Sequence, residues 1–343
     1  MDNLSRRIKY LDLLRVSAIF MMVQGHTVDT LLSLQFRSSE YFLYNLWVNL
    51  RAYTAPVFFF TSGAVLSWVL SNTEEVKYYK RVKKGFVRAL ELILIGYLLR
   101  FPSHKVFDFS HVTNEGWKIF FTVDALHLIS FGVFLILVTH FVFHKLRVNT
   151  GMPFLIATIL VVLFSGTINE INWKEIVSYP VAGYFCFETG SYFPLFPYLT
   201  YIFLGAFIGT TIHKENLTQS NLYFLISGVI LTIIPLVFDM GNVSKIVHIS
   251  GVLLVLTEIY KKISMAKFIN FSKICLISDK SLLIYVVHLV ILYGCAWFPG
   301  FYKIAGQKFS VEITLIFVIL MLILSYSLVI FTDRFFKKKQ MAK

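Results

Sequence analysis

Long apolar runs alternate with short polar segments along the whole chain of 343 residues. A helix needs roughly 20 consecutive apolar residues to cross the hydrocarbon layer of a bilayer. About ten runs approach that length, and they lack the alternation over about ten residues that is typical of barrel strands. The pattern therefore predicts an all-α, polytopic integral membrane protein. The expected spans are residues 11–34, 46–70, 86–101, 119–143, 152–165, 195–211, 222–238, 246–260, 281–298 and 311–331.

The distribution of Lys and Arg predicts how these spans are oriented, because cytoplasmic loops are enriched in both residues. If the N-terminus is cytoplasmic, the segments on that side hold 22 of the 32 Lys and Arg, and those on the other side hold 9. The remaining one, Arg15, lies within a span. The asymmetry predicts about ten transmembrane helices with both termini in the cytoplasm. Since no internal repeat or second domain is evident, we interpret residues 1–343 as a single transmembrane domain.

Composition agrees with a membrane protein and excludes several other classes. The chain is 57% hydrophobic and 15% charged, whereas soluble domains carry about 25% charged residues. Its net charge of +13 falls in short clusters between apolar runs, so we expect no nucleic acid partner. Cys186, Cys275 and Cys295 have neither metal-like nor disulfide-framework spacing, so we expect packing roles for them and no metal.

The first apolar run is longer than the 7 to 15 residues of a signal-peptide core. We therefore expect it to be retained as the first span. This retained span and the compact chain favour a bacterial cytoplasmic membrane as the location.

Two polar segments offer candidate binding surfaces. Residues 166–194 mix aromatic and polar side chains that suit a carbohydrate or a lipid headgroup, or an amphipathic helix on the membrane surface. Residues 74–88 are basic and aromatic, which suits anionic membrane lipid or a phosphorylated cosubstrate, with lipid contact the favoured interpretation.

The first span carries four ionisable side chains, which are costly in a membrane and are therefore functional candidates. Arg15 and His26 are eleven positions apart, so on a helix they lie about 20° from each other and roughly 16 Å apart along the axis. Asp29 and Asp12 fall about 40° and 60° from Arg15. The spacing predicts one polar stripe that faces the interior of the helix bundle.

The depth of each residue in the membrane suggests its chemical role. Arg15, near the cytoplasmic edge, can hold a phosphate or an acyl carbonyl, and His26, past the midplane, can accept a proton from a nucleophile. Asp29, one turn from His26, can orient the imidazole. Structural alternatives stay open, because Asp12 and Arg15 can form a capping ion pair and a buried His can serve as a hydrogen bond between helices.

Several motifs resemble a known superfamily. The run from Arg6 to Arg15, followed by ten residues and His26, is similar to the opening of the transmembrane acyltransferase superfamily, and the chain also resembles the acyltransferase 3 family. More specifically, the chain resembles bacterial relatives of heparan-alpha-glucosaminide N-acetyltransferase. Val16 departs from the Gly that this group has after its Arg. The further matching motifs are residues 54–63 ending in Ser62-Gly63, 124–129, 193–198 with Gly205 and Gly209, and 281–288.

This resemblance implies an acyltransferase that uses a cytoplasmic acyl-CoA, most simply acetyl-CoA. The acceptor would be a hydroxyl or amine of an extracytoplasmic glycan or glycolipid. His26 would act as general base or accept the acyl group itself, and Arg15 would position the donor. We expect the basic residues Lys83, Lys84 and Arg88 to receive the coenzyme phosphates.

Further polar residues in or at the ends of spans are expected to line the substrate cavity. Asp124 and His127 share a helical face at a spacing of three, as do Tyr285 and His288, although packing hydrogen bonds explain these pairs equally well. The full expected set is Asp12, Arg51, Ser62, Asp124, His127, Tyr285 and His288.

Other functional classes remain open at this point. A proton-coupled transporter or flippase of a polar lipid or saccharide would use the same ionisable stripe as a proton relay. A sensor or assembly component without turnover is a third alternative. The oligomeric state is also open, with a homodimer as one alternative.

Overall fold

The computed structural model describes residues 7–148, 150–212 and 219–341. Arg6, Lys214 and Lys343, which entered the charge count on the cytoplasmic side, lie outside the described residues. Within the described ranges no strand forms, and β-type pairing is limited to two isolated bridges. The predicted all-α class is confirmed.

The chain divides into two compact units, and each is described by itself. Unit 1 comprises residues 1–11 and 56–267, and unit 2 comprises residues 12–55 and 268–343. The helices are α1 Lys9–Leu31, η1 Leu34–Phe36, α2 Phe42–Arg51, α3 Thr54–Ser71, α4 Glu75–Leu99, α5 Asn114–Phe120, α6 Ala125–Lys145, α7 Gly151–Glu170, α8 Trp173–Ile176, α9 Tyr179–Ala182, η2 Phe187–Thr189, α10 Leu195–Thr211, α11 Leu222–Val237, η4 Gly241–Val243, α12 Ser244–Ile263, α13 Phe271–Asp279, α14 Ser281–Tyr293, α15 Gly300–Ala305 and α16 Val311–Met341.

Every expected span contains a helix, but several bounds were wrong. The second span comprises α2 and α3, which a turn at Ala52 and Tyr53 separates and which together form one candidate span at Phe42–Ser71. Pro56 lies in the first turn of α3, where its missing N–H costs nothing. Helix α4 begins eleven residues before the expected start because the Lys, Arg and Glu residues there are good helix formers. Helix α14 ends at Tyr293, before Gly294 with its positive φ of 86°.

Five helical segments among the described residues are long and apolar enough to cross a membrane, or six if α13 and α14, bent by 62°, form one span. Their outward faces are strongly apolar: only 22% of the apolar window of α16 is buried, and Ile316, Ile319 and Ile323 are more than half exposed. Lipid is the medium that such faces require. The chain is a multi-pass membrane protein, and the count of ten spans stays a prediction.

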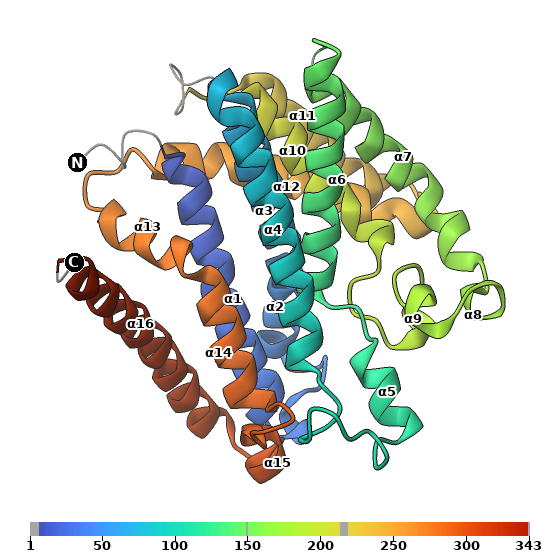
Figure 1. Ribbon diagram of the computed structural model, residues 1–343, viewed down its shortest axis with the longest axis vertical. Helices are drawn as coiled ribbons and strands as arrows, with labels where there is room; N and C mark the ends of the chain where they lie inside the picture. The colour runs from blue at the N-terminus through green and yellow to red at the C-terminus, as the bar shows by residue number, and fades with distance from the viewer. Residues whose placement is uncertain (1–6, 149, 213–218, 342–343) are drawn as a thin grey trace. The chain divides into compact units, whose positions relative to one another are not determined.

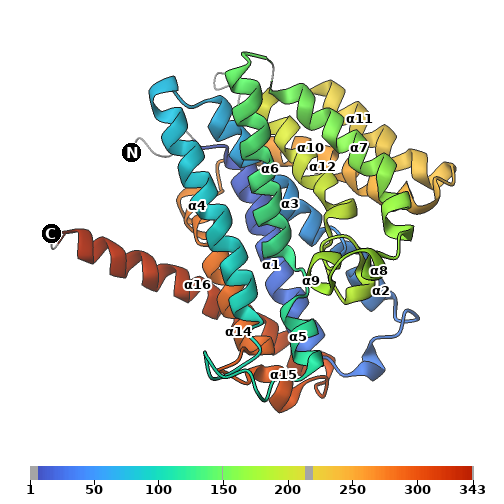
Figure 2. The same cartoon turned by 45° about the vertical axis from the view of Figure 1, so that its right-hand side comes forward.

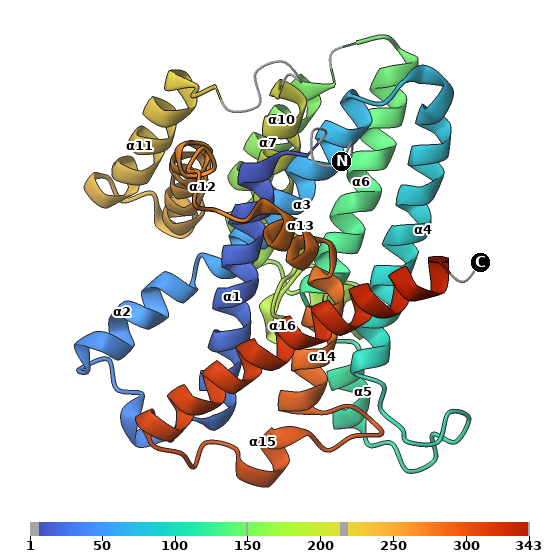
Figure 3. The same cartoon turned by 90° about the vertical axis from the view of Figure 1, so that its left-hand side faces the viewer.

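In unit 1, neighbouring helices pack as pairs. Helix α4 runs beside α6, and α7 beside α10 (Figures 1 and 2), while α11 pairs with α12 (Figure 3). Helices α3 and α10 meet through glycine: a Cβ on Gly63 would overlap the Ile202 carbonyl, and one on Gly205 would overlap the Phe60 carbonyl. Small residues allow this close approach of helix backbones in membranes.

In unit 2, the C-terminal end of α1 is joined to the segment before α16. Gln307 N donates to Thr30 O at 2.9 Å, and Phe309 N donates to Leu31 O at 3.0 Å. Arg37 covers the same helix end by donating to the backbone carbonyls of Val28, Asp29 and Leu32. Except for that of Val28, which also accepts from Leu32 N, these carbonyls lie in the last turn and at the C-cap, where the helix itself supplies no partner. The end of α1 that carries His26 is therefore fixed by hydrogen bonds. Helices α14 and α16 of the same unit are seen in Figure 3.

Candidate functional site

His26 lies on an unbroken helix and is held by residues of α14. Helix α1 is continuous from Lys9 to Leu31, so Arg15 and His26 keep the spacing of eleven residues on one face. His26 is partly exposed, and its Nδ1 lies 3.1 Å from the hydroxyl of Tyr293. The Tyr293 ring meets the imidazole edge-on, with ring centroids 5.6 Å apart. The hydrogen-bonded partner fixes the orientation of the imidazole.

A second imidazole accompanies His26. The ring of His288 lies 5.3 Å from that of His26, measured between centroids, and 5.8 Å from that of Tyr285. His288 is buried, and its Nδ1 donates to the carbonyl of Ile284 at 2.7 Å. Its Nε2 is buried and has no hydrogen-bond partner within the described part of the chain. The predicted pair of Tyr285 and His288 therefore lies next to His26.

Asp29 lies against Arg51 of α2. The two side chains form a bidentate ion pair, with 2.5 Å between Nη1 and Oδ1. Gly25 leaves room for this arrangement, because a Cβ there would lie 3.3 Å from Arg51 Nε. The Arg51 guanidinium also stacks over Trp47, whose Nε1 donates to Gln24 at 2.9 Å. The expected role of Asp29 as the residue that orients His26 stays a prediction.

Asp12, at the start of α1, is buried and accepts hydrogen bonds from α13. Ser278 Oγ donates to it at 2.6 Å, and Cys275 Sγ lies 3.7 Å away. These contacts fix α13 to α1 within unit 2. Arg15, one turn further along α1, is partly buried.

Unit 1 contains a separate carboxylate–imidazole pair. Asp124 is the N-cap of α6 and accepts from the backbone N–H of Leu126 and of His127. The same carboxylate lies 2.8 Å from His127 Nδ1 and 3.6 Å from Arg100. His127 is fully buried, and its Nε2 has no hydrogen-bond partner among the described residues. The predicted pair is thus formed, but as a cap on the helix.

The surroundings of His127 are tightly packed. A Cβ on Gly96 would lie only 2.7 Å from His127 Cε1, and the Tyr97 ring meets the imidazole edge-on at 4.3 Å. The Tyr97 hydroxyl bonds to the hydroxyl of Tyr184 at 3.0 Å. Burial, together with this hydrogen bond, raises the pKa of Tyr184. Tyr184 therefore stays a neutral phenol over this buried pair.

Ser62, the polar residue of the Ser-Gly motif, forms a hydrogen bond within its own helix. Its hydroxyl donates to the carbonyl of Phe58 at 2.8 Å. A serine that bonds back to the preceding turn exposes less of its hydroxyl to a ligand. Its expected place in the substrate cavity stays a prediction.

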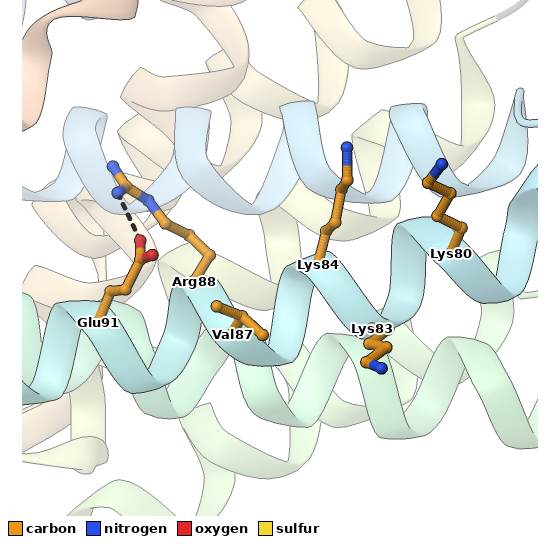
Figure 4. A pocket seen from close by; sticks show the side chains of 6 residues that line it. All are labelled: Lys80, Lys83, Lys84, Val87, Arg88 and Glu91. Atoms are coloured by element: carbon orange, nitrogen blue, oxygen red, sulfur yellow. Dashed lines mark hydrogen bonds and ion pairs between the residues drawn. The ribbon is translucent and has the colours of Figure 1, made fainter.

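The basic residues of α4 divide between two sides of the helix. Lys80, Lys84 and Arg88 recur every four residues and project to one side, whereas Lys83 points away from them (Figure 4). They border a shallow depression of about 530 Å³. Arg88 is also paired with Glu91 at 3.1 Å. Lys80 completes a row of three cations that the sequence interpretation did not single out.

Two further functional candidates were missed in the sequence. Tyr293 contacts His26 across 267 positions of the chain, and no local spacing links the two residues. Arg100 contacts Asp124 but had entered the interpretation only through its charge. Among the described residues, no group of three or more His, Cys, Asp or Glu side chains could hold a metal ion.

Apolar helices with outward-facing aliphatic side chains, together with histidines clustered within each unit, define a multi-pass helical membrane protein with a candidate catalytic imidazole. A family model described as the catalytic domain of heparan-alpha-glucosaminide N-acetyltransferase matches residues 7–248. The chain belongs to this family, which confirms the predicted resemblance, and membership implies acetyltransferase activity. No curated protein and no solved structure matches the chain. The matched region includes Arg15, His26 and Asp29 but ends before α14.

Proposed function

We propose that the protein is a membrane-embedded acetyltransferase that transfers an acetyl group from cytoplasmic acetyl-CoA to an amine or hydroxyl of an extracytoplasmic glycan or glycolipid. The observation that carries the proposal is the hydrogen bond between His26 Nδ1 and Tyr293, on a helix that also presents Arg15. Family membership supplies the reaction class. The match runs through residues of both units, and we propose that residues 1–343 act as one catalytic domain.

His26 is the general base in this proposal. In the tautomer that carries its proton on Nδ1, this N–H donates a hydrogen bond to the Tyr293 oxygen. Nε2 then holds the lone pair and can accept a proton from the acceptor. The acceptor amine or hydroxyl loses its proton to Nε2 as its N or O forms the bond to the acetyl carbonyl carbon. The C–S bond of the thioester then breaks, and the proton returns from His26 to the thiolate. The products are the acetylated acceptor and free coenzyme A.

Arg15 holds the donor in the same proposal. A guanidinium offers several fixed donors to a phosphate or a carbonyl oxygen and stays charged. Lys80, Lys84 and Arg88 receive phosphate groups of the coenzyme, since their side chains project to one side of α4 (Figure 4). If the chain has ten spans and cytoplasmic termini, as the sequence predicts, the basic end of α4 lies on the donor side.

Free thiol release from acetyl-CoA by purified protein tests the proposal. We expect release that depends on an added amino sugar or glycan, and its loss in His26→Ala. The matched control is His111→Ala, which removes an exposed loop histidine without a place in this chemistry. Equal turnover in folded His26→Ala and wild type would refute the role of His26, and wild type without donor-dependent release would refute acetyl transfer itself.

A further inference from the structure

A pocket on unit 1 is lined by side chains that the proposed chemistry does not use. It is a shallow depression of about 410 Å³, comparable to the one that borders α4. Helix α5 and the residue after it supply one wall, and α9 supplies the other. We call this site the aromatic pocket. Its lining residues are Asn114, Trp117, Lys118, Phe121, Tyr179 and Pro180.

The aromatic faces in this pocket are held in place before any ligand binds. The rings of Trp117 and Phe121 are nearly parallel, at 23° with centroids 6.0 Å apart. The Trp117 ring also packs against that of Phe109, with centroids 5.4 Å apart, so two neighbouring rings restrain it. The Tyr179 hydroxyl donates to the carbonyl of Thr189 at 2.7 Å, which fixes its ring. Fixed rings lose little conformational entropy when a ligand stacks on them.

Polar groups stand beside these flat surfaces. Asn114 is exposed and offers an amide that can both donate and accept. The ammonium of Lys118 adds donors and lies 3.4 Å from Glu115. No histidine or carboxylate lines the pocket, so it offers no base for acyl transfer. Its chemistry is that of binding.

We propose that the aromatic pocket binds a pyranose ring of the acceptor glycan. The ring held there is not the one that is being acetylated. A pyranose has an apolar face of C–H groups, which stacks on aromatic rings, and a rim of hydroxyls, which bond to amide and ammonium groups. In this proposal Trp117 and Tyr179 stack on the apolar face of the sugar. Asn114 and Lys118 form hydrogen bonds with its hydroxyls. The role as part of an acceptor site rests on the proposed function, whereas saccharide binding can be measured alone.

The aromatic and basic residues also suit the membrane–water interface, where Trp and Tyr are enriched. An interfacial belt binds lipid headgroups and has no preference for sugars. A lipid-only response is therefore the outcome that opposes a saccharide pocket.

Equilibrium binding tests the inference in protein reconstituted into lipid nanodiscs, with sugar-based detergents removed because they would compete. The probes are three β-linked trisaccharides: cellotriose, the trimer of glucosamine and the trimer of N-acetylglucosamine. We expect at least one to bind wild type, with Trp117→Ala and Asn114→Ala each weakening it tenfold or more. The matched control is Phe107→Ala, which removes an aromatic ring that is 95% exposed and lies outside the pocket.

The outcomes separate this inference from the proposed function. Binding by wild type and by His26→Ala, lost in the pocket variants, supports the pocket even if no thiol is released. Unchanged affinity in both folded pocket variants overturns it, even if acetyl transfer is intact. Absence of binding by all three sugars, or a response of the variants to lipid composition alone, also overturns it.

Discussion

His26 and His127 differ in what surrounds an imidazole of the same chemistry. His127 is fully buried, its Nδ1 is bound to the carboxylate that caps α6, and Gly96 lies against its ring. His26 is partly exposed and is held at Nδ1 by a phenol, with a second imidazole 5.3 Å away. A carboxylate–imidazole pair is the arrangement that catalytic triads use. In this protein the carboxylate–imidazole pair is Asp124 and His127, and it lies in the more tightly packed of the two histidine surroundings.

The two histidines therefore differ in access to the ring as well as in the chemistry of the partner. A general base must come within hydrogen-bond reach of the proton that it takes. His127 satisfies the pairing but is enclosed between helices α4 and α6, so its contacts stabilise the packing and the start of α6. His26 has the weaker partner and is partly exposed. We therefore propose that His26 carries the chemistry and that His127 serves helix packing.

The largest expected effect is the loss of turnover in His26→Ala. Removal of a general base lowers kcat by roughly 10²–10⁴-fold, and because the ring is partly exposed, the melting temperature should change little. Thiol release and thermal melting of the same preparations measure both quantities. Full activity in the folded variant would reverse the assignment of the two histidines.

Gly96→Ala should lower stability without removing chemistry. The new Cβ would lie 2.7 Å from His127 Cε1, and overpacking of this kind costs about 1–3 kcal/mol. Gly166→Ala on α7 is the matched control, since nothing lies within 4 Å of the added Cβ. Thermal melting should show a lower midpoint for Gly96→Ala alone, with kcat of the folded fraction close to wild type. A large loss of kcat without a loss of stability would instead give His127 a direct catalytic role.

Tyr293→Phe should reduce kcat more than it changes the KM for acetyl-CoA. It removes the one hydrogen bond described for the His26 ring, and a neutral hydrogen bond contributes roughly 0.5–1.5 kcal/mol, or up to about tenfold in rate. Steady-state kinetics with a saturating acceptor measures this effect. An unchanged kcat would mean that Tyr293 does not orient the imidazole.

Asp29→Asn is expected to have the smallest effect. The Asp29–Arg51 ion pair is partly exposed, with side chains 25% and 34% accessible, and exposed pairs contribute about 0–1 kcal/mol. Comparison of kcat with that of Tyr293→Phe decides which residue orients His26. A loss larger than that of Tyr293→Phe would favour the role for Asp29 that the sequence predicts.

Much of the fold could be predicted because the bilayer imposes a strong local rule. Each expected span contains a helix, since apolar side chains in lipid require the backbone to bond within its own segment. The bounds were less predictable. Charged residues extend α4 well beyond its apolar run, and a single turn divides the second span into α2 and α3. Hydropathy alone responds to neither feature.

The candidate site, like the fold, has features that the sequence predicts and features that it does not. The spacing of Arg15 and His26 was readable because both lie on one helix, where residue number fixes angle and rise. The partner of His26 was not readable, since Tyr293 comes from a helix far away in sequence. The ion pair of Asp29 with Arg51 likewise depends on how α2 packs on α1.

By itself, the sequence determined the helical membrane class, the family, and the stripe of Arg15 and His26, because periodicity and hydropathy act over a few turns of one helix. Only the tertiary structure decided that Tyr293 holds His26 while His127 is enclosed against Gly96. The physical reason is that hydrogen bonding and burial of a side chain depend on distant segments that packing brings together, and no local pattern records them.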